Sequence, residues 1–301
     1  MESKFNNAVT VIGKPTNKEI KDFGSGLGEV YVRAGQDSVK FQKWNDDYNP
    51  TAGEDLVNGL EVGKKYQIQG NMSEREFDGS IFREVKPWNN IKEVGEDVDE
   101  KAVIGLSGDV YKLNMSYPQE VLGFEYEGEA VPKFDFKLLL FNNYNKDTKE
   151  NDLTRQQVLI NTIEYYGDKC KKDGIDANFD QLTKWLETLE DGGVAEVYDI
   201  YEKLKKTSCK LYKMSEITLT ALGDIGQEMA DNVVVGDNIT LGAFIENRMN
   251  FVPIKRDFFG NPLEGQKEQD NSQKEAINRI RVDNYSVNEK TLSKKSKKTG
   301  W

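Results

Sequence analysis

Histidine is absent from this chain and cysteine is scarce. The 301 residues include no histidine and two cysteines, Cys170 and Cys209, which form no CxxC pair. No imidazole can therefore serve as a general acid or base, as a zinc ligand, or as the partner of a catalytic serine or cysteine. A carboxylate metal site is the remaining option, but no carboxylate motif is recognisable among the 52 acidic residues. We therefore expect a protein that is not an enzyme and holds no metal or cofactor.

Long apolar runs are missing as well. No stretch approaches the about 18 residues that a membrane-spanning helix requires. The first residues, MESKFNNAVTV, lack a charged start followed by an apolar stretch, which predicts no secretory signal. We expect a cytoplasmic protein that does not associate with membranes.

Basic residues are fewer than acidic ones, and the charge is unevenly distributed along the chain. The net charge is −11. Acidic residues are concentrated between 91 and 265, whereas residues 266–301 are basic and end in KKSKKTGW. Because salt confines the field of a surface charge to about 8–10 Å, an acidic chain can still bind nucleic acid in a locally basic groove.

The first 90 residues have the pattern of an all-β unit. Strands are expected at 7–14, 29–35, 38–44, 61–70 and 81–88, with a Gly-rich loop at 15–28 and a short helical or irregular crossover at 51–60. Three strands, a crossover and a closing hairpin are the order of the OB-fold, a small Greek-key barrel. Another small β-sandwich or an SH3-like barrel is the alternative.

Residues beyond 90 predict a second domain of mixed character. We expect a charged linker at 91–101, a β-rich and OB-like domain at 102–265 with a helical insertion at about 150–206, and a flexible basic tail at 266–301. Two short echoes suggest the second barrel. VTVIGKP is followed later by AVIGLSG, and VGKKYQIQG by VVGDNITLG, in the same order in both halves. The fold class is therefore mainly β with α insertions.

The candidate site is the outward face of residues 29–44. Alternation directs Val30, Val32, Val39 and Phe41 inward and Tyr31, Arg33, Lys40 and Trp44 outward. Aromatic rings on such a face can stack on the bases of a single strand, at about 1–3 kcal/mol per base, while cations hold its phosphates. Lys43 is expected to join Arg33 and Lys40 in that second role. A cross-strand aromatic pair that only stabilises the sheet is the alternative.

Loops flanking this face carry further candidates. Lys14, Lys18, Lys21 and Phe23 belong to the first loop region, and Arg75 and Phe77 to the hairpin before the fifth strand. Cationic loops with aromatic tips could close on a nucleic-acid strand, although a solvated polar loop has the same composition.

The stretches NAVTVIGK, VYVRAG, VKFQKW, GLEVGKKYQIQG and FDGSIFREV, in this order, resemble the single-stranded DNA-binding proteins of bacteria and their phages. The resemblance covers about a third of the chain. It implies an OB-fold in which Tyr31, Arg33, Lys40, Trp44, Lys14, Arg75 and Phe77 contact the strand. The size, the second barrel and the helical insertion suggest a phage version, which would act in the host cytoplasm.

One departure concerns the tail. The family usually ends in an acidic tail with a terminal aromatic, whereas this tail is basic and ends in Trp301. The resemblance would make the tail a contact for replication or recombination proteins, and the basic charge argues against recruitment in the family's manner.

The function expected from the sequence is sequence-tolerant binding and coating of single-stranded DNA during replication, recombination or repair. RNA is left open as a ligand, and so is the oligomeric state. A different class is kept as the alternative, namely an OB-like structural or assembly protein of a virion or scaffold that binds no nucleic acid. A carboxylate-metal nuclease is a third possibility, which the missing motif disfavours.

Overall fold

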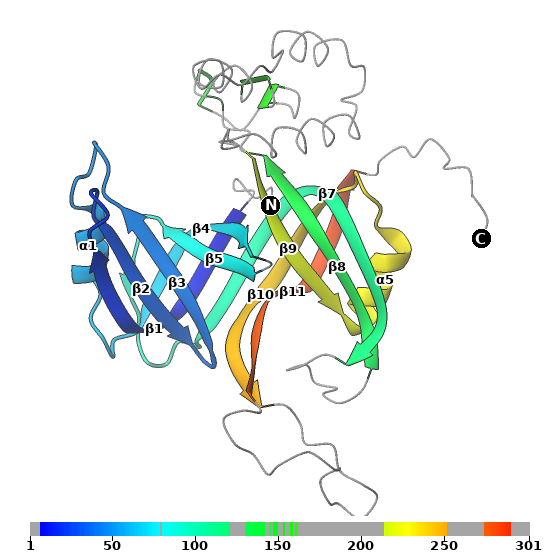
Figure 1. The fold of residues 1–301 in the computed structure, drawn as a ribbon, viewed down its shortest axis with the longest axis horizontal. Helices are drawn as coiled ribbons and strands as arrows, with labels where there is room; N and C mark the ends of the chain where they lie inside the picture. The colour runs from blue at the N-terminus through cyan, green and yellow to red at the C-terminus, as the bar shows by residue number, and fades with distance from the viewer. Residues whose placement is uncertain are drawn as a thin grey trace, which may run out of the picture.

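The structure, a computed structural model, describes residues 7–120 except Gly79, 130–141, 145, 147–149, 153, 157–158, 160–161, 214–251 and 274–289. These residues form two β-barrels that lie side by side (Figure 1). No described helix is long and apolar enough to span a membrane.

The first barrel is a closed ring of five strands. Its elements are β1 (Asn7–Lys21), β2 (Leu27–Ala34), β3 (Asp37–Trp44), α1 (Ala52–Asn58), β4 (Tyr66–Phe77) and β5 (Ser80–Pro87). Antiparallel pairing joins β1 to β2, β2 to β3, β5 to β4, and β4 back to β1. A parallel bridge between Phe41 and Val85 closes the ring between β3 and β5. This topology is that of the OB-fold, as the sequence predicted.

Alternation along β2 and β3 fills the inside of this barrel. Val30, Val32 and Phe41 are fully buried, and Val39 is nearly so. Burial of one such side chain stabilises the fold by about 1.5–3 kcal/mol relative to an exposed position. The inward and outward assignment made from the sequence is therefore confirmed for these four residues.

The first strand is longer than the sequence predicted. The expected loop at 15–28 is a strand as far as Lys21, because β1 continues past Pro15 through an irregularity between Pro15 and Asn17. Proline has no N–H to donate, and a bulge is one of the few places where a strand accepts it. The second half of β1 therefore extends the outward face of β2.

The second barrel repeats the order of the first. Its elements are β7 (Lys101–Glu120), β8 (Ala130–Phe141), β9 (Met214–Leu222), α5 (Gly223–Asn232), β10 (Asn238–Phe251) and β11 (Lys274–Glu289). Antiparallel pairs join β7 to β8, β8 to β9, β11 to β10, and β10 back to β7. A parallel bridge between Arg281 and Thr220 joins β11 to β9. The expected second β domain is thus a second OB-like ring, with its helix after the third strand as in the first.

The end of the chain corrects one expectation. The sequence predicted a flexible tail from 266, yet residues 274–289 form β11, the closing strand of the second barrel. Ile277, Ile280 and Val282 of this strand are buried. Apolar residues are sparse here because only one face of β11 meets the core. The expected helical insertion at 150–206 lies almost wholly outside the described residues.

The expected linker at 91–101 is bound to the first barrel. The short β6 (Lys92–Glu93) pairs with Tyr66 and Gln67 of β4. Lys65 donates from its ammonium group to the carbonyl oxygens of Glu96 and Val98, each at 2.9 Å. These bonds fix the direction in which the chain enters β7.

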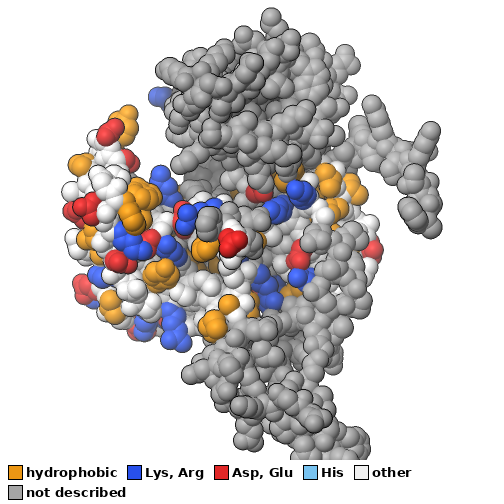
Figure 2. All heavy atoms as spheres, viewed as in Figure 1, with side chains coloured by type: hydrophobic (Ala, Val, Ile, Leu, Met, Phe, Trp, Pro, Cys, Tyr) orange, Lys and Arg blue, Asp and Glu red, His pale blue; other side chains and the backbone are white. Residues whose placement is uncertain are grey.

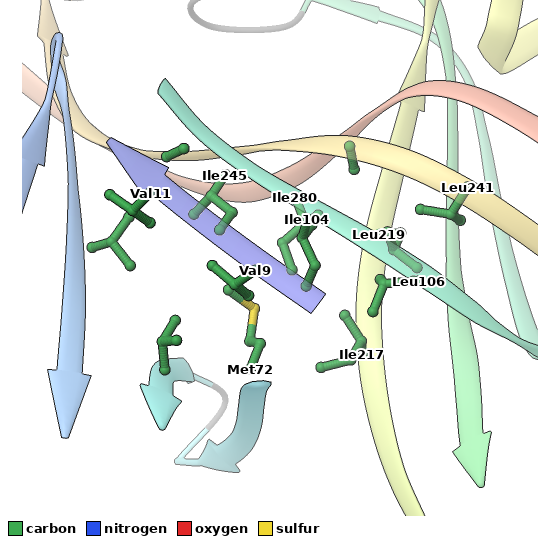
Figure 3. Packing of buried hydrophobic residues seen from close by; sticks show 14 of the residues in the cluster. Val9, Val11, Met72, Ile104, Leu106, Ile217, Leu219, Leu241, Ile245 and Ile280 are labelled. Atoms are coloured by element: carbon green, nitrogen blue, oxygen red, sulfur yellow. The ribbon is translucent and has the colours of Figure 1, made fainter. Parts of the chain in front are cut away.

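The two barrels are joined by backbone and by core. Asn7–Ile12 of β1 pairs antiparallel with Lys101–Leu106 of β7. Val9 and Ile104 belong to a single cluster of buried residues that extends through both barrels (Figure 3). Because equivalent strands meet antiparallel, the barrels face each other as two subunits related by a two-fold axis would.

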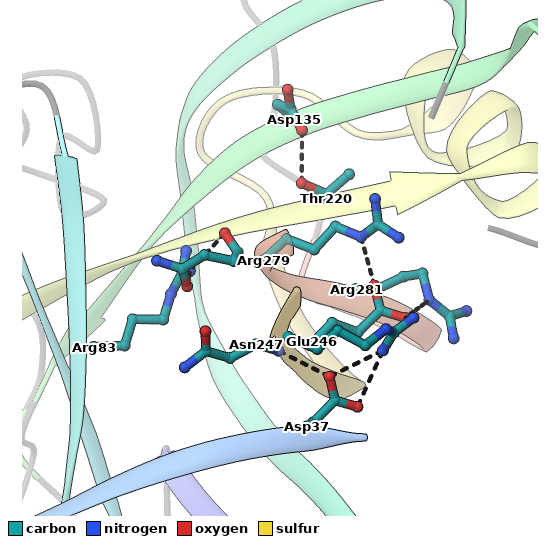
Figure 4. A network of polar contacts seen from close by, with 10 residues as sticks. Asp37, Arg83, Asp135, Thr220, Glu246, Asn247, Arg279 and Arg281 are labelled. Carbon is teal, nitrogen blue, oxygen red and sulfur yellow. Dashed lines mark hydrogen bonds and ion pairs between the residues drawn. The ribbon is translucent and has the colours of Figure 1, made fainter. Parts of the chain in front are cut away.

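Polar contacts repeat the two-fold pattern at the junction. Glu74 of β4 accepts from the backbone N–H of Thr218 on β9 at 3.1 Å and forms an ion pair with Arg83 at 2.9 Å. In the reciprocal contact, Asp37 of β3 accepts from the backbone N–H of Asn247 and from Arg248 on β10, each at 2.9 Å (Figure 4). Each barrel therefore sets its closing hairpin against the third strand of the other.

Candidate nucleic-acid interface

The outward face of the first barrel is built by β1, β2 and β3. Register places Tyr31 between Asn17 of β1 and Lys40 of β3. One step along, Glu29 lies between Glu19 and Gln42, and at the end of the strands Leu27 lies opposite Trp44. The sequence-predicted Tyr31, Arg33, Lys40 and Trp44 therefore share one surface.

Two aromatic rings are exposed together at one end of this face. Trp44 is 46% exposed and Phe23, in the loop between β1 and β2, is 66% exposed. Their ring centroids lie 6.0 Å apart with the planes tilted by 44°. Exposed rings of this size lose favourable burial unless a ligand covers them. Tyr31, farther along the face, is partly buried.

A buried carboxylate lies at the centre of the same face. Glu29 is 3% exposed although it points outward from β2. The ammonium groups of Lys21 and Lys40 lie 2.6 and 2.7 Å from its two oxygens, and Gln42 donates a further hydrogen bond. Lys40, predicted to hold phosphate, and Lys21, predicted as a cation of the flanking loop, are therefore already paired within the protein.

The contacts in this cluster shift the pKa values of Glu29 and Lys21. Burial raises the pKa of the Glu29 carboxyl, but hydrogen bonds from Lys21, Lys40 and Gln42 outweigh it and leave the pKa below its ordinary value. The hydrogen bond to Glu29 raises the pKa of Lys21. Both shifts favour the charged forms of Glu29 and Lys21.

At the other end of the face, the cations line an open cleft. Lys14 and Arg33 contribute to a cleft of about 520 Å³, together with Glu100 and the turn at Val62. Lys14 forms an ion pair with Glu96 at 2.9 Å, and Arg33 donates to the carbonyl oxygen of Gly35 at 2.9 Å. Arg33 is exposed, so part of its guanidinium remains available to a ligand.

Two predicted lysines serve the fold instead of this face. Lys18 donates to the carbonyl oxygens of Val57 and Leu60 at 2.8 and 2.5 Å, which satisfies the end of α1. Lys43 lies opposite Gly28, on the other side of the sheet from Trp44, and donates to Asn89 at 2.8 Å. Strand alternation alone separates Lys43 from Trp44.

The hairpin of β4 and β5 carries the last two candidates. The Arg75 guanidinium lies 5.4 Å from the ring centroid of Phe82, which is 46% exposed. Phe77 pairs through its backbone with Ser80, and its side chain lies outside the described residues. Phe82 is therefore an exposed aromatic on this hairpin that the sequence did not predict as a contact for nucleic acid.

Sequence reasoning also missed Glu29 as a member of the site. Its position in the alternation with Tyr31 and Arg33 was available, and so was its outward direction. Nothing in the local sequence showed that Lys21, eight residues earlier, would return beside it, because that depends on β1 continuing beyond Pro15.

The equivalent face of the second barrel is different in chemistry. Its outward residues on β8 and β9 are Lys133, Asp135, Lys137, Glu216, Thr218 and Thr220. Lys133 pairs with Asp135 at 2.9 Å and Lys137 with Glu216 at 3.5 Å. Within the described part of β8 and β9, this face presents no aromatic ring to solvent.

The view in Figure 2 shows lysine and arginine side chains over both barrels, interleaved with acidic ones. Exposed apolar side chains are also visible over the first barrel. Among the described residues, the side of the molecule seen in this view is therefore mixed in charge and shows no continuous basic groove.

Comparisons with known proteins yield structural neighbours alone. No protein-family model and no curated protein matches the chain. The wild-type single-stranded DNA-binding protein from Thermus aquaticus is similar, with 9% identity, a TM-score of 0.46 and coverage of 96% of each chain. A deletion mutant of that protein gives 10% identity, a TM-score of 0.47 and coverage of 96% of this chain and 98% of the other. Both scores are low, so the functional conclusion rests on this chain's own geometry.

Proposed function

We propose that this chain binds single-stranded DNA without sequence preference and coats it during replication, recombination or repair. The observation that carries the proposal is the exposed pair of Phe23 and Trp44 at the edge of the β1–β3 face. Strands 2 and 3 of an OB-fold and their loops form its usual ligand surface. Bases of any identity stack on such rings because every base has a π-face.

The charges of the face support a binding mode dominated by stacking. Lys14, Lys21 and Lys40 each have a carboxylate partner within 3 Å. A lysine that is already neutralised releases few counterions when a phosphate arrives, so it adds little salt dependence. We therefore expect an affinity that falls only modestly as salt is raised.

The test is a titration of the full chain with oligo-dT, duplex DNA and single-stranded RNA at two salt concentrations. Tryptophan quenching and strand affinity are measured for wild type, for Trp44→Ala combined with Phe23→Ala, and for Val234→Ala as an exposed apolar control in the second barrel. Loss of two stacks predicts a decrease in affinity of roughly 30-fold or more. Equal affinity in the double variant, or indifference of wild type to every oligonucleotide, would contradict the proposal.

A further inference from the structure

Glu29, Lys21, Lys40 and Gln42 form a cluster that we call the Glu29 cluster. Its carboxylate binds the same lysines that a phosphate of the proposed ligand would contact. The carboxylate is 4% exposed at its side chain, whereas the side chains of Lys21 and Lys40 are 32% and 23% exposed. The side chains of both lysines are therefore partly exposed, while the acid that binds them is buried. Each ammonium group has three N–H donors, so both retain donors for a ligand.

The charges around this point cancel. Besides Glu29, the second acid beside Lys21 is Glu19 of β1, at 3.5 Å and 57% exposed. Two ammonium groups thus face two carboxylates on neighbouring strands. Gln42 adds a neutral donor to Glu29. A phosphate that approaches the middle of the face meets donors but little net positive charge.

We propose that Glu29 acts as a resident substitute for a phosphate, holding Lys21 and Lys40 in place and cancelling much of their charge toward a bound strand. This inference rests on the proposed function. A carboxylate and a phosphodiester each carry one negative charge and accept the same charge-assisted hydrogen bonds. The lysines stay ordered without DNA, and the strand is held through its bases more than through its phosphates at this point.

Removing the charge of Glu29 should strengthen the ionic part of binding. The variant Glu29→Gln keeps the shape and a hydrogen-bonding oxygen but frees about one unit of positive charge. For single strands, log affinity against log salt should then steepen by about 0.7. At low salt, one more unpaired charge about 6 Å from a phosphate raises affinity roughly threefold.

The experiment measures oligo-dT affinity across a salt series for wild type, Glu29→Gln and Glu93→Gln. Glu93 of β6 is the matched control, because it forms an ion pair with Lys64 at 3.3 Å and β6 pairs with β4 and not with β2 or β3. We expect a steeper slope and tighter low-salt binding for Glu29→Gln, and wild-type behaviour for Glu93→Gln. Circular dichroism checks that each variant is folded.

Glu19→Gln keeps the proposal testable if Glu29→Gln does not fold. This acid is exposed and should give a change of the same sign and smaller size. If wild type binds oligo-dT and the folded Glu29→Gln and Glu19→Gln variants show the same salt slope as wild type, the proposed role of Glu29 is overturned. The proposed function would still stand in that case. Failure of wild type to bind any oligonucleotide would instead overturn the proposed function, and this inference with it.

Discussion

At the scale of single residues, a close approach between β2 and α1 supports the aromatic end of the face. A Cβ added to Gly28 on β2 would lie 2.0 Å from the carbonyl oxygen of Gly53 on α1. Asn45, the residue after Trp44, accepts from the N–H of Gly53 at 2.8 Å. Helix α1 therefore rests directly on the strand beside Trp44, and two glycines make that contact possible.

We expect Gly28→Ala to destabilise the chain by about 1–3 kcal/mol, because the methyl group would force α1 away from β2. Urea unfolding followed by circular dichroism measures the change. Gly105→Ala is the control, since its nearest contact would be the carbonyl oxygen of Ala8 at 4.0 Å. A Gly28→Ala variant as stable as wild type would mean that α1 does not sit this close to β2.

The alternation of residues predicted which side chains of β2 and β3 fill the barrel, but it predicted only some of the residues on the outward face. It placed Val30, Val32 and Phe41 correctly, because a period of two is a local property of a strand. The same rule puts Lys43 on the side opposite Trp44, which differs from the expectation that Lys43 joins Arg33 and Lys40 on the outward face. The pairing of Lys21 with Glu29 is a tertiary contact, for which the sequence offers no local signal.

At the scale of elements, β11 illustrates how a closing strand can resemble a tail. Its buried side chains belong to Ile277, Ile280 and Val282, and its other face carries charges such as Arg279 and Arg281. Both arginines contact the buried Glu246 of β10. Composition alone cannot separate a one-sided strand of this kind from a solvated segment.

Two truncations test the assignment of β11. Deleting residues 274–301 removes a strand of the second barrel and exposes the core of β9 and β10, so we expect loss of cooperative unfolding for that barrel. Deleting residues 290–301 removes no described strand, and we expect a melting temperature close to that of wild type. Equal melting curves for the two truncations would show that β11 is not part of the barrel.

The elements that sequence reasoning predicted well were the short, strongly alternating ones. Strands at 29–35 and 38–44 match β2 and β3 within two residues. The boundary at Pro15 failed because a proline usually ends a central strand, whereas here a bulge accommodates it. The order of echoes in the two halves was the sequence signal that indicated the second barrel.

At the scale of the whole molecule, a buried ion pair of the first barrel lies at the junction with the second barrel. Arg83 and Glu74 are only 9% and 6% exposed at their side chains. Arg83 also donates to the side-chain oxygen of Asn278 on β11 at 2.6 Å, and Glu74 accepts from Thr218. Each member therefore contacts the opposite barrel, and neither can lose its partner without leaving a charge in a poorly solvated place.

We expect Arg83→Ala to lower the free energy of unfolding by about 3–5 kcal/mol, because Glu74 would remain buried and unpaired by its cation. Arg75→Ala, on the same hairpin but exposed, should change it by about 0.5 kcal/mol or less. Chemical denaturation of the full chain compares the two. A small effect of Arg83→Ala, similar to that of Arg75→Ala, would show that the junction does not depend on this pair.

The pairing of β1 with β7 has a consequence for synthesis on the ribosome. All five strands of the first barrel are complete at Pro87, but the outer edge of Asn7–Ile12 has no partner until Lys101–Leu106 has been made. Until then the nascent chain carries an open strand edge, which is a template for pairing with another copy. Because only a short segment that is bound to the first barrel separates Pro87 from β7, the strand edge is open for a short time. Strand β7 can then pair with this edge before another copy of the chain does.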